Sequence, residues 1–248
     1  MDRCEKRMGR AEKLVVLLAD EGVRWKETVE KLTDEIEKLV GNVFLSAAGI
    51  SYAGPFTGVY RKKLFSKWVE TCTEKGIPIS EDFDLIKIMG DPVVIRGWNI
   101  ASLPGDQVST ENGILATRGQ RWPLMIDPQQ QANKWIKTME KNNELIILKF
   151  GVLNFLRTLG SAVTTGRPVL VEDMEEYVDP GVDPILQKQV YKTESGIYQI
   201  RIGDTNFDYD ENFKFFMTTK MPNPHYLPEV CIKVTLINFT VTFKGLED

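Results

Sequence analysis

The sequence has few of the residues that build disulfide frameworks and metal centres. Its three cysteines, Cys4, Cys72 and Cys231, are far apart and odd in number, and His225 is the sole histidine. No closely spaced Cys or His pair of the metal-binding kind occurs, so we expect neither a metal site nor a disulfide framework. This usage fits a reducing, intracellular compartment.

An excess of one charge and a long apolar run are also missing. The 31 Lys and Arg residues against 35 Asp and Glu residues give a formal net charge of −4. Such a balance gives no general attraction to phosphate backbones or anionic membranes, so we expect neither nucleic acid nor membrane as a partner. No apolar run approaches the length of about 18 residues needed to span a bilayer. The length of 248 residues allows one large domain or two small ones.

Residues 5–40 contain no proline and are dominated by good helix formers. Opposite charges at i and i+4, as in Glu27–Lys31 and Asp34–Lys38, support a helix. The apolar stripe of this helix is spaced as in a coiled coil and consists of Leu14, Leu18, Trp25, Val29, Leu32, Ile36 and Leu39. No second long heptad segment follows, so its partner would lie on another chain or on a missing part of this one. The alternative is an amphipathic helix packed on the following domain.

Both ends of the sequence suggest a piece of a longer chain, because it begins within a charged helical pattern and stops at KGLED. Residues 41–76 keep a helical pattern that Pro55 interrupts and that ends at a glycine cap near Gly76. A further helix is expected after Ser80, which would be its N-cap.

Between residues 91 and 119 the sequence predicts a short strand, turns and a short helix at Ser109–Ala116. From Arg121 onward, apolar strands alternate with helices, which implies a parallel sheet with crossover helices and ligand sites at the carboxyl ends of the strands. The expected strands lie within 121–127, 143–151, 167–176, 213–220 and 234–242, and the expected crossover helices within 132–140 and 154–166.

The segment Asp127–Trp135 occupies the place of a phosphate-binding loop, DPQQQANKW against the pattern GPxGxGKT. Aligned on that pattern, the three glycines are replaced by Asp127, Gln130 and Ala132. Asn133 stands in place of the lysine, and Lys134 in place of the hydroxyl residue. We therefore expect no cofactor to bind here. A plain strand–turn–helix without any phosphate-binding history is the other interpretation.

The third expected strand ends in two acids, Glu172 and Asp173. Acids at this place hold magnesium in nucleotide hydrolases, but their order here is reversed from Asp-Glu. Four acids in six residues are also typical of a solvated strand end, so no catalytic residue is assigned.

Several long strings are more specific than any single motif: GDPVVIRGWNIASLPGDQVSTENGI, RWPLMIDPQQQANKWIK, TTKMPNPHYLPE and KVTLINFTVT followed by GLED. Together they resemble the dynein heavy chains, over essentially all 248 residues and in collinear order. The strings NPHYLPE and RWPLMIDP with ANKW are more similar to the axonemal heavy chains than to the cytoplasmic one.

The resemblance implies an AAA+ fold of the P-loop NTPase type. Residues 1–40 would be the ring-proximal end of the returning stalk helix, and 41–248 the large α/β subdomain of the fifth AAA+ module, with a helical lead-in at 41–90 and a core at 91–248. Asn223 would lie near the sensor position. Glu229 would fall where active modules carry an arginine, with Lys233 as the next cation.

The resemblance also implies a function: a fragment of an ATP-driven, minus-end-directed microtubule motor of the cytoskeleton and the ciliary axoneme. This piece would be a nucleotide-free structural module between motor ring and stalk, with ATP and Mg bound in other modules. Its partners would be the neighbouring AAA+ modules, the outgoing stalk helix and, through the stalk tip, the microtubule. Two other hypotheses stay open, a divergent ATPase that still binds ATP and a free-standing coiled-coil adaptor.

Overall fold

A computed structural model describes residues 2–240, without the side chains of residues 2–6, 10–12, 14, 16, 17 and 20. The chain forms two compact units. The first consists of Met1–Leu45 and Lys67–Phe83, and the second of Ser46–Ser66 and Asp84–Asp248. Among the described helices, none is long and apolar enough to cross a membrane.

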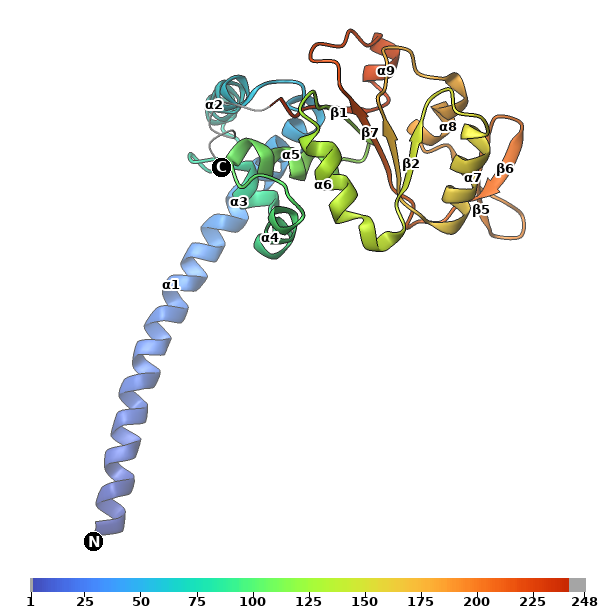
Figure 1. Ribbon diagram of the computed structural model, residues 1–248. Coiled ribbons are helices and arrows are strands. Elements are labelled where there is room, and N and C mark those ends of the chain that lie inside the picture. Colours follow the sequence, from blue (N-terminus) through green and yellow to red (C-terminus); the bar gives the residue numbers. More distant parts are fainter. Residues whose placement is uncertain (1, 241–248) are drawn as a thin grey trace. The chain divides into compact units, whose positions relative to one another are not determined.

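The first unit is built on α1 (Asp2–Tyr52), the long blue helix of Figure 1, and on the end of α2 (Gly58–Glu74). The helix expected over residues 5–40 is thus confirmed. Its apolar stripe is exposed: Trp25 is 72% accessible and Ile36 67%. The side chain of Leu14, assigned to the same stripe, lies outside the described residues.

One of the two expected ion pairs of this helix is confirmed and the other needs correction. Lys38 pairs with Asp34 at 2.7 Å as expected. Lys31 instead contacts Glu35, one turn after it, at 3.7 Å, and not the expected Glu27, one turn before it. Exposed pairs of this kind contribute little to stability, so the choice of partner has small consequences.

The segment after α2 packs on α1 within this first unit. Leu45, Cys72 and Ile79 form its small buried core. Asn42 and Ser80 exchange two hydrogen bonds, from Asn42 Nδ2 to Ser80 Oγ (2.9 Å) and from the Ser80 N–H to Asn42 Oδ1 (3.1 Å). The prediction of Ser80 as a helix N-cap is therefore wrong, because its polar atoms bind Asn42.

The end of α2 agrees with the sequence, since Gly76 has the left-handed φ of +69° that a glycine adopts readily. The following helix, α3 (Leu85–Met89), begins later than predicted. Its N-cap is Asp84, whose carboxylate accepts the N–H of Ile86.

The second unit is organised by a five-stranded sheet in the order β2-β3-β7-β1-β8, with all neighbours parallel. The strands are β1 (Pro123–Ile126), β2 (Ile146–Lys149), β3 (Val169–Glu172), β7 (Phe215–Thr219) and β8 (Thr235–Asn238). All five lie within the ranges expected from the sequence. Residues 241 and 242 of the last expected range lie outside the described residues.

Both faces of this sheet are covered, which is why its strands read as continuous apolar runs. Successive side chains alternate between the faces. Leu124, Val171 and Phe215 belong to one core, and Met125 and Leu170 to the other. Figure 1 shows α5 (Gln107–Arg118) and α6 (Gln131–Met139) on one side of the strands and α7 (Phe155–Thr165) and α8 (Asp183–Leu186) toward the other.

The helices of the second unit confirm most of the predicted ones. Helix α5 includes the expected Ser109–Ala116, and α7 ends at Gly166, whose φ is +67°. The strand expected between residues 91 and 119 is wrong, because α4 (Pro92–Ile100) occupies its place. Asp91 caps this helix by accepting the N–H of Val93, and Pro92 fits its first turn.

The sequence analysis missed a second, antiparallel sheet inserted between β3 and β7. It consists of β4 (Val190–Lys192), β5 (Tyr198–Ile202) and β6 (Thr205–Asp208). The short helical segments are η1 (Lys141–Asn143), η2 (Pro180–Val182) and α9 (Pro228–Cys231).

A buried ion pair joins α2 to α5 within the second unit. Arg61 is 1% exposed and donates from Nε to Ala53 O (3.0 Å) and from Nη2 to Gly54 O (2.9 Å). Its Nη1 lies 3.5 Å from Glu111 Oε2. Burial lowers the pKa of Arg61 and raises that of Glu111, each against the opposing attraction of its partner.

Replacing Arg61 with methionine should lower the free energy of unfolding by about 3–5 kcal/mol, because the Glu111 carboxylate then stays buried without its cation. Urea unfolding followed by circular dichroism measures this change. The double variant Arg61→Met/Glu111→Leu should recover part of the loss. Lys62→Met, on the exposed face of α2, should change stability little, and an equal loss in both methionine variants would contradict the ion-pair explanation.

Candidate functional site: a phosphate-type loop filled by its own carboxylate

The loop after β1 has the backbone path of a tight strand-to-helix turn. The Asp127 N–H donates to Thr219 O at 2.9 Å and extends the pairing of β1 with β7. The turn closes through a hydrogen bond of 3.2 Å from the Gln130 N–H to Asp127 O. Gln130, which aligns with a glycine of the phosphate-loop pattern, adopts a left-handed φ of 60°. That conformation costs a residue with a side chain about 1 kcal/mol or more.

The Asp127 carboxylate occupies the amino-terminal end of α6. It is 1% exposed. Its Oδ1 accepts the N–H of Gln131 at 2.8 Å, and its Oδ2 accepts the N–H of Asn133 at 2.9 Å. Free N–H groups at a helix amino terminus are the groups that bind phosphate in nucleotide-binding loops. In this chain an internal anion already uses them.

Burial and hydrogen bonding act in opposite directions on this carboxylate. Burial raises the pKa of Asp127, and hydrogen bonds from the backbone N–H groups at the start of α6 lower it, with a net rise. Burial therefore disfavours the ionised form of Asp127, and the aligned N–H groups of α6 offset part of this unfavourable free energy.

The residues after Asp127 turn toward the sheet. Ala132 is fully buried, and Asn133 is 8% exposed. Asn133 Nδ2 donates to Glu172 Oε1 at 2.7 Å. Lys134, in the place of the hydroxyl residue, is exposed to solvent. The structure thus brings Asp127, Asn133 and Glu172 together at the carboxyl edge of the sheet.

Three lysines neutralise the two acids at the end of β3. Lys137 pairs with Glu172, and Lys149 and Lys220 both pair with Asp173. Partial burial would raise the pKa of Glu172, but hydrogen bonds from Lys137 and Asn133 outweigh it and lower the pKa. The hydrogen bonds from Lys149 and Lys220 lower the pKa of Asp173.

These lysines were missed by the sequence analysis. Lys137 lies one turn after Asn133 on the same face of α6, so helical spacing could have identified it. Lys149 and Lys220 follow from the strand order, which places the ends of β2 and β7 on either side of β3.

The remaining predicted site residues lie elsewhere. Asn223 is exposed in the loop after β7. Glu229 is exposed at the start of α9, and Lys233 Nζ pairs with Asp183 Oδ2 at 2.7 Å. Lys233 is therefore held within its own unit. The two cysteines with described side chains, Cys72 and Cys231, are free thiols, and the side chain of Cys4 lies outside the described residues.

Comparison with known protein families matches the two parts of the chain separately. Residues 2–71 match the family described as the microtubule-binding stalk of dynein motor, and residues 96–248 match the ATP-binding dynein motor region. The chain belongs to the axonemal dynein heavy chains. The stalk match includes the exposed stripe of α1, and the motor-region match includes the loop filled by Asp127.

Individual relatives agree with this assignment. The chain is 54% identical over 242 residues to dynein axonemal heavy chain 6 of Homo sapiens, a match that covers 98% of the chain. It is 47% identical over 247 residues to dynein axonemal heavy chain 1 of Mus musculus, covering 100% of the chain. It spans about 6% of the length of each of these relatives.

Replacing Asp127 with asparagine should lower the free energy of unfolding by about 1–3 kcal/mol at neutral pH, because the amide NH2 faces a backbone N–H and leaves it unsatisfied. The loss should also depend on pH. Since the folded-state pKa is raised, the contribution of the Asp127 carboxyl is complete below the unfolded pKa of about 4 and falls as pH rises through the folded pKa. The difference in the free energy of unfolding between the native chain and Asp127→Asn should therefore become smaller as pH rises from about 4.

Urea unfolding between pH 4 and 8 measures that difference, with Asp204→Asn at a fully exposed turn as the matched control. If this difference in unfolding free energy increased with rising pH, the hydrogen bonds from the backbone N–H groups would outweigh burial, and the folded-state pKa of Asp127 would be lowered.

Proposed function

We propose that these residues act in an axonemal dynein heavy chain as a structural AAA+ module that binds no nucleotide and links the motor ring to the stalk. The observation that carries the proposal is the Asp127 carboxylate on the N–H groups of Gln131 and Asn133. A nucleotide phosphate would have to displace this carboxylate and would meet its negative charge.

The magnesium side of the site supports the same conclusion. ATP is bound with a magnesium ion that needs a hydroxyl and an acid. The hydroxyl position is Lys134, and Glu172 and Asp173 are already paired with lysines. The residues present therefore do not fit Mg-ATP, and we derive no hydrolytic step from them.

The linking role is supported by how the end of α1 is held in the second unit. Arg121 Nη2 donates to Ser51 O at 3.1 Å, and Arg61 donates to Ala53 O and Gly54 O. Ile50 packs against the core that contains Trp98 and Trp135. Transmission of a movement needs two states with different contacts, and these anchors are the contacts through which a ring movement would reach α1.

The exposed stripe of α1 supports the outgoing stalk helix of the same heavy chain as its partner. Trp25, Val29 and Ile36 are each more than 60% exposed, and such a row is stable in water when a second helix covers it. The remaining partners would be the neighbouring AAA+ modules and, through the stalk tip, the microtubule of the ciliary axoneme.

Isothermal titration of the chain with Mg-ATP tests the nucleotide-free state, and we expect no saturable heat up to millimolar nucleotide. The variant Asn133→Lys should also fail to bind, although it restores the missing lysine, because Asp127 still occupies the N–H groups. The double variant Asp127→Gly/Asn133→Lys removes the carboxylate and restores the lysine together, and its titration completes the comparison.

Micromolar binding by the native chain would establish the divergent-ATPase hypothesis instead. Binding by Asn133→Lys alone would show that the carboxylate yields to phosphate and that the lysine was the only missing element.

Analytical ultracentrifugation separates a stalk helix from a free-standing adaptor. We expect a monomer at micromolar concentration, because the stripe of a stalk helix matches another segment of the same heavy chain. Leu32→Asp should leave this sedimentation unchanged, as should Glu30→Ser on the polar face. A strong dimer that Leu32→Asp dissociates and Glu30→Ser does not would identify an adaptor.

A further inference from the structure

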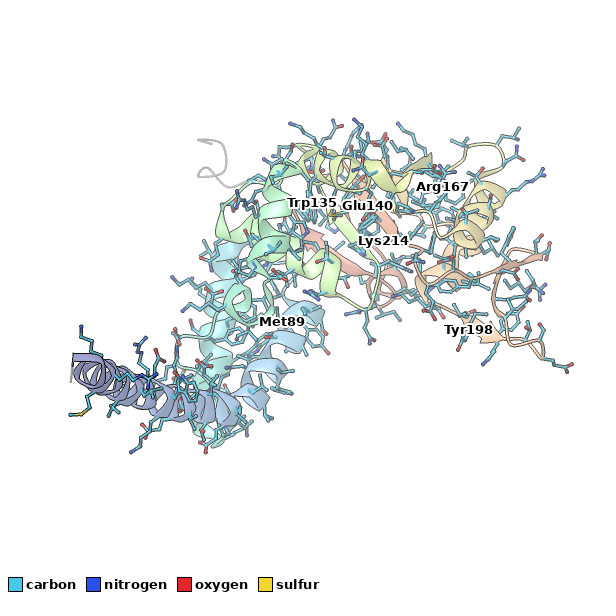
Figure 2. The ribbon with its side chains drawn as sticks, turned by 90° about the horizontal axis from the view of Figure 1, so that it is seen from below. Met89, Trp135, Glu140, Arg167, Tyr198 and Lys214 are labelled. Carbon is cyan, nitrogen blue, oxygen red and sulfur yellow. The ribbon has the colours of Figure 1, made fainter. Side chains whose placement is uncertain are left out.

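The exposed stripe of α1 follows the heptad repeat of a coiled coil without a break from residue 8 to residue 43. Counted in alternating steps of three and four residues, its core positions, which we call the seam, are Met8, Ala11, Val15, Leu18, Gly22, Trp25, Val29, Leu32, Ile36, Leu39 and Val43. All the large side chains of the seam are exposed, from 48% at Val43 to 72% at Trp25. Figure 2 shows side chains standing out along the blue ribbon of this helix. The seam is therefore a surface that a second helix can cover.

From Val15 onward, most of the seam has the pattern that favours two-stranded coils, in which β-branched residues alternate with leucine. The pattern is interrupted at two neighbouring positions. Gly22 stands where a β-branched residue is expected, and Trp25 stands where a leucine is expected. The residue without a side chain and the residue with the largest one are therefore adjacent in the seam, within one turn of α1. The regular positions are Val15, Val29, Ile36 and Val43 for the β-branched residues and Leu18, Leu32 and Leu39 for leucine.

Neither exception is explained by the fold of the chain itself. A Cβ built on Gly22 meets no atom within 4 Å among the described residues, so no neighbouring group requires a glycine there. Glycine inside a helix also lowers the stability of the helix relative to alanine. The indole of Trp25 is exposed, although it is the largest apolar group of the seam. A partner helix that receives the indole and fills the space above Gly22 accounts for both residues.

We propose that Gly22 and Trp25 form a size key that fixes the register of the helix paired with α1. This partner carries a bulky apolar side chain opposite Gly22 and a glycine, alanine or serine opposite Trp25. The partner is the outgoing stalk helix of the same heavy chain, so the inference rests on the proposed function. The match of residues 2–71 to the microtubule-binding stalk of dynein motor supports this choice.

The size key distinguishes registers that the rest of the seam does not. The layers of valine, isoleucine and leucine resemble one another, so a partner displaced by one heptad would find similar contacts at each of them. At the key, the same displacement moves the bulky side chain onto Val15 or Val29 and leaves Gly22 without it. One layer is then overpacked and another contains a cavity, and both changes are destabilising.

The facing residues are identified in the full heavy chain with a photo-crosslinking amino acid in place of Lys26, an exposed residue beside Trp25. We expect a crosslink to the outgoing stalk helix. The core layers there should place leucine, methionine, phenylalanine, tyrosine or tryptophan opposite Gly22, and a small residue opposite Trp25.

Two results would contradict this expectation in different ways. A crosslink to the outgoing helix at layers of equal size, or with the sizes reversed, would overturn the size key and leave the proposed partner in place. A crosslink outside the stalk would overturn the partner as well, and with it the proposed linking function.

The variant Gly22→Leu tests whether the size of this layer fixes the register. The added side chain overfills the layer, so the crosslink of the native register should decrease roughly fivefold or more, with new crosslinks one heptad away. Gly9→Leu is the matched control, since it makes the same exchange in α1 outside the seam, where an added Cβ also meets no atom within 4 Å among the described residues. It should leave the crosslink unchanged.

A second exchange separates the size key from a general disturbance of α1. In the Gly22→Leu chain, replacing the identified bulky residue of the partner with alanine exchanges the two sizes and should restore the native crosslink. Equal effects of Gly22→Leu and Gly9→Leu, an unchanged crosslink in Gly22→Leu, or no recovery on this replacement would overturn the proposal.

Discussion

The carboxyl edge of the sheet is arranged around one interaction, the Asp127 carboxylate on the amino-terminal N–H groups of α6. A parallel sheet with a helix after its first strand places those N–H groups, and the positive end of the helix dipole, at this edge in any sequence. They need an anion. Here the chain itself supplies an anion from Asp127, the first residue after β1.

The other charges at this edge follow from that arrangement. With Asp127 fixed inside the loop, Glu172 and Asp173 would add two further negative charges nearby. Lys137, Lys149 and Lys220 offset them, each through a direct ion pair. Asn133 connects the two groups of residues, since its backbone N–H binds Asp127 and its amide binds Glu172. A lysine at Asn133 would bring a charge where the structure uses a neutral donor.

The sequence was sufficient for the main sheet because strands buried on both faces read as short apolar runs, as in PLMI and VLVE. It failed where β-branched residues form a helix, because Val93, Val94 and Ile95 resemble a strand. Helix α4 forms there because Asp91 caps it, Pro92 fits its first turn and Trp98 is buried. The sheet β4–β6 was missed because its strands are mostly polar and partly exposed. Asp127, Asn133 and Glu172 were found by alignment on a motif, whereas the lysines become visible only when the strand order is known.

A bound nucleotide stabilises a protein by an amount that depends on the nucleotide concentration and affinity. The stability of a module that needs a nucleotide therefore changes as the nucleotide binds and leaves. An internal carboxylate is always present at the same place. In the proposed nucleotide-free state, this carboxylate would hold the start of α6 in the absence of any ligand. For a module proposed to carry movement between ring and stalk, a permanent internal anion is an advantage, because the contacts of Arg121 with Ser51 and of Arg61 with Ala53 and Gly54 would then lead into a core that needs no bound nucleotide. In the proposed role, the Asp127 carboxylate is a fixed structural contact at the position where a phosphate-binding loop would hold its ligand.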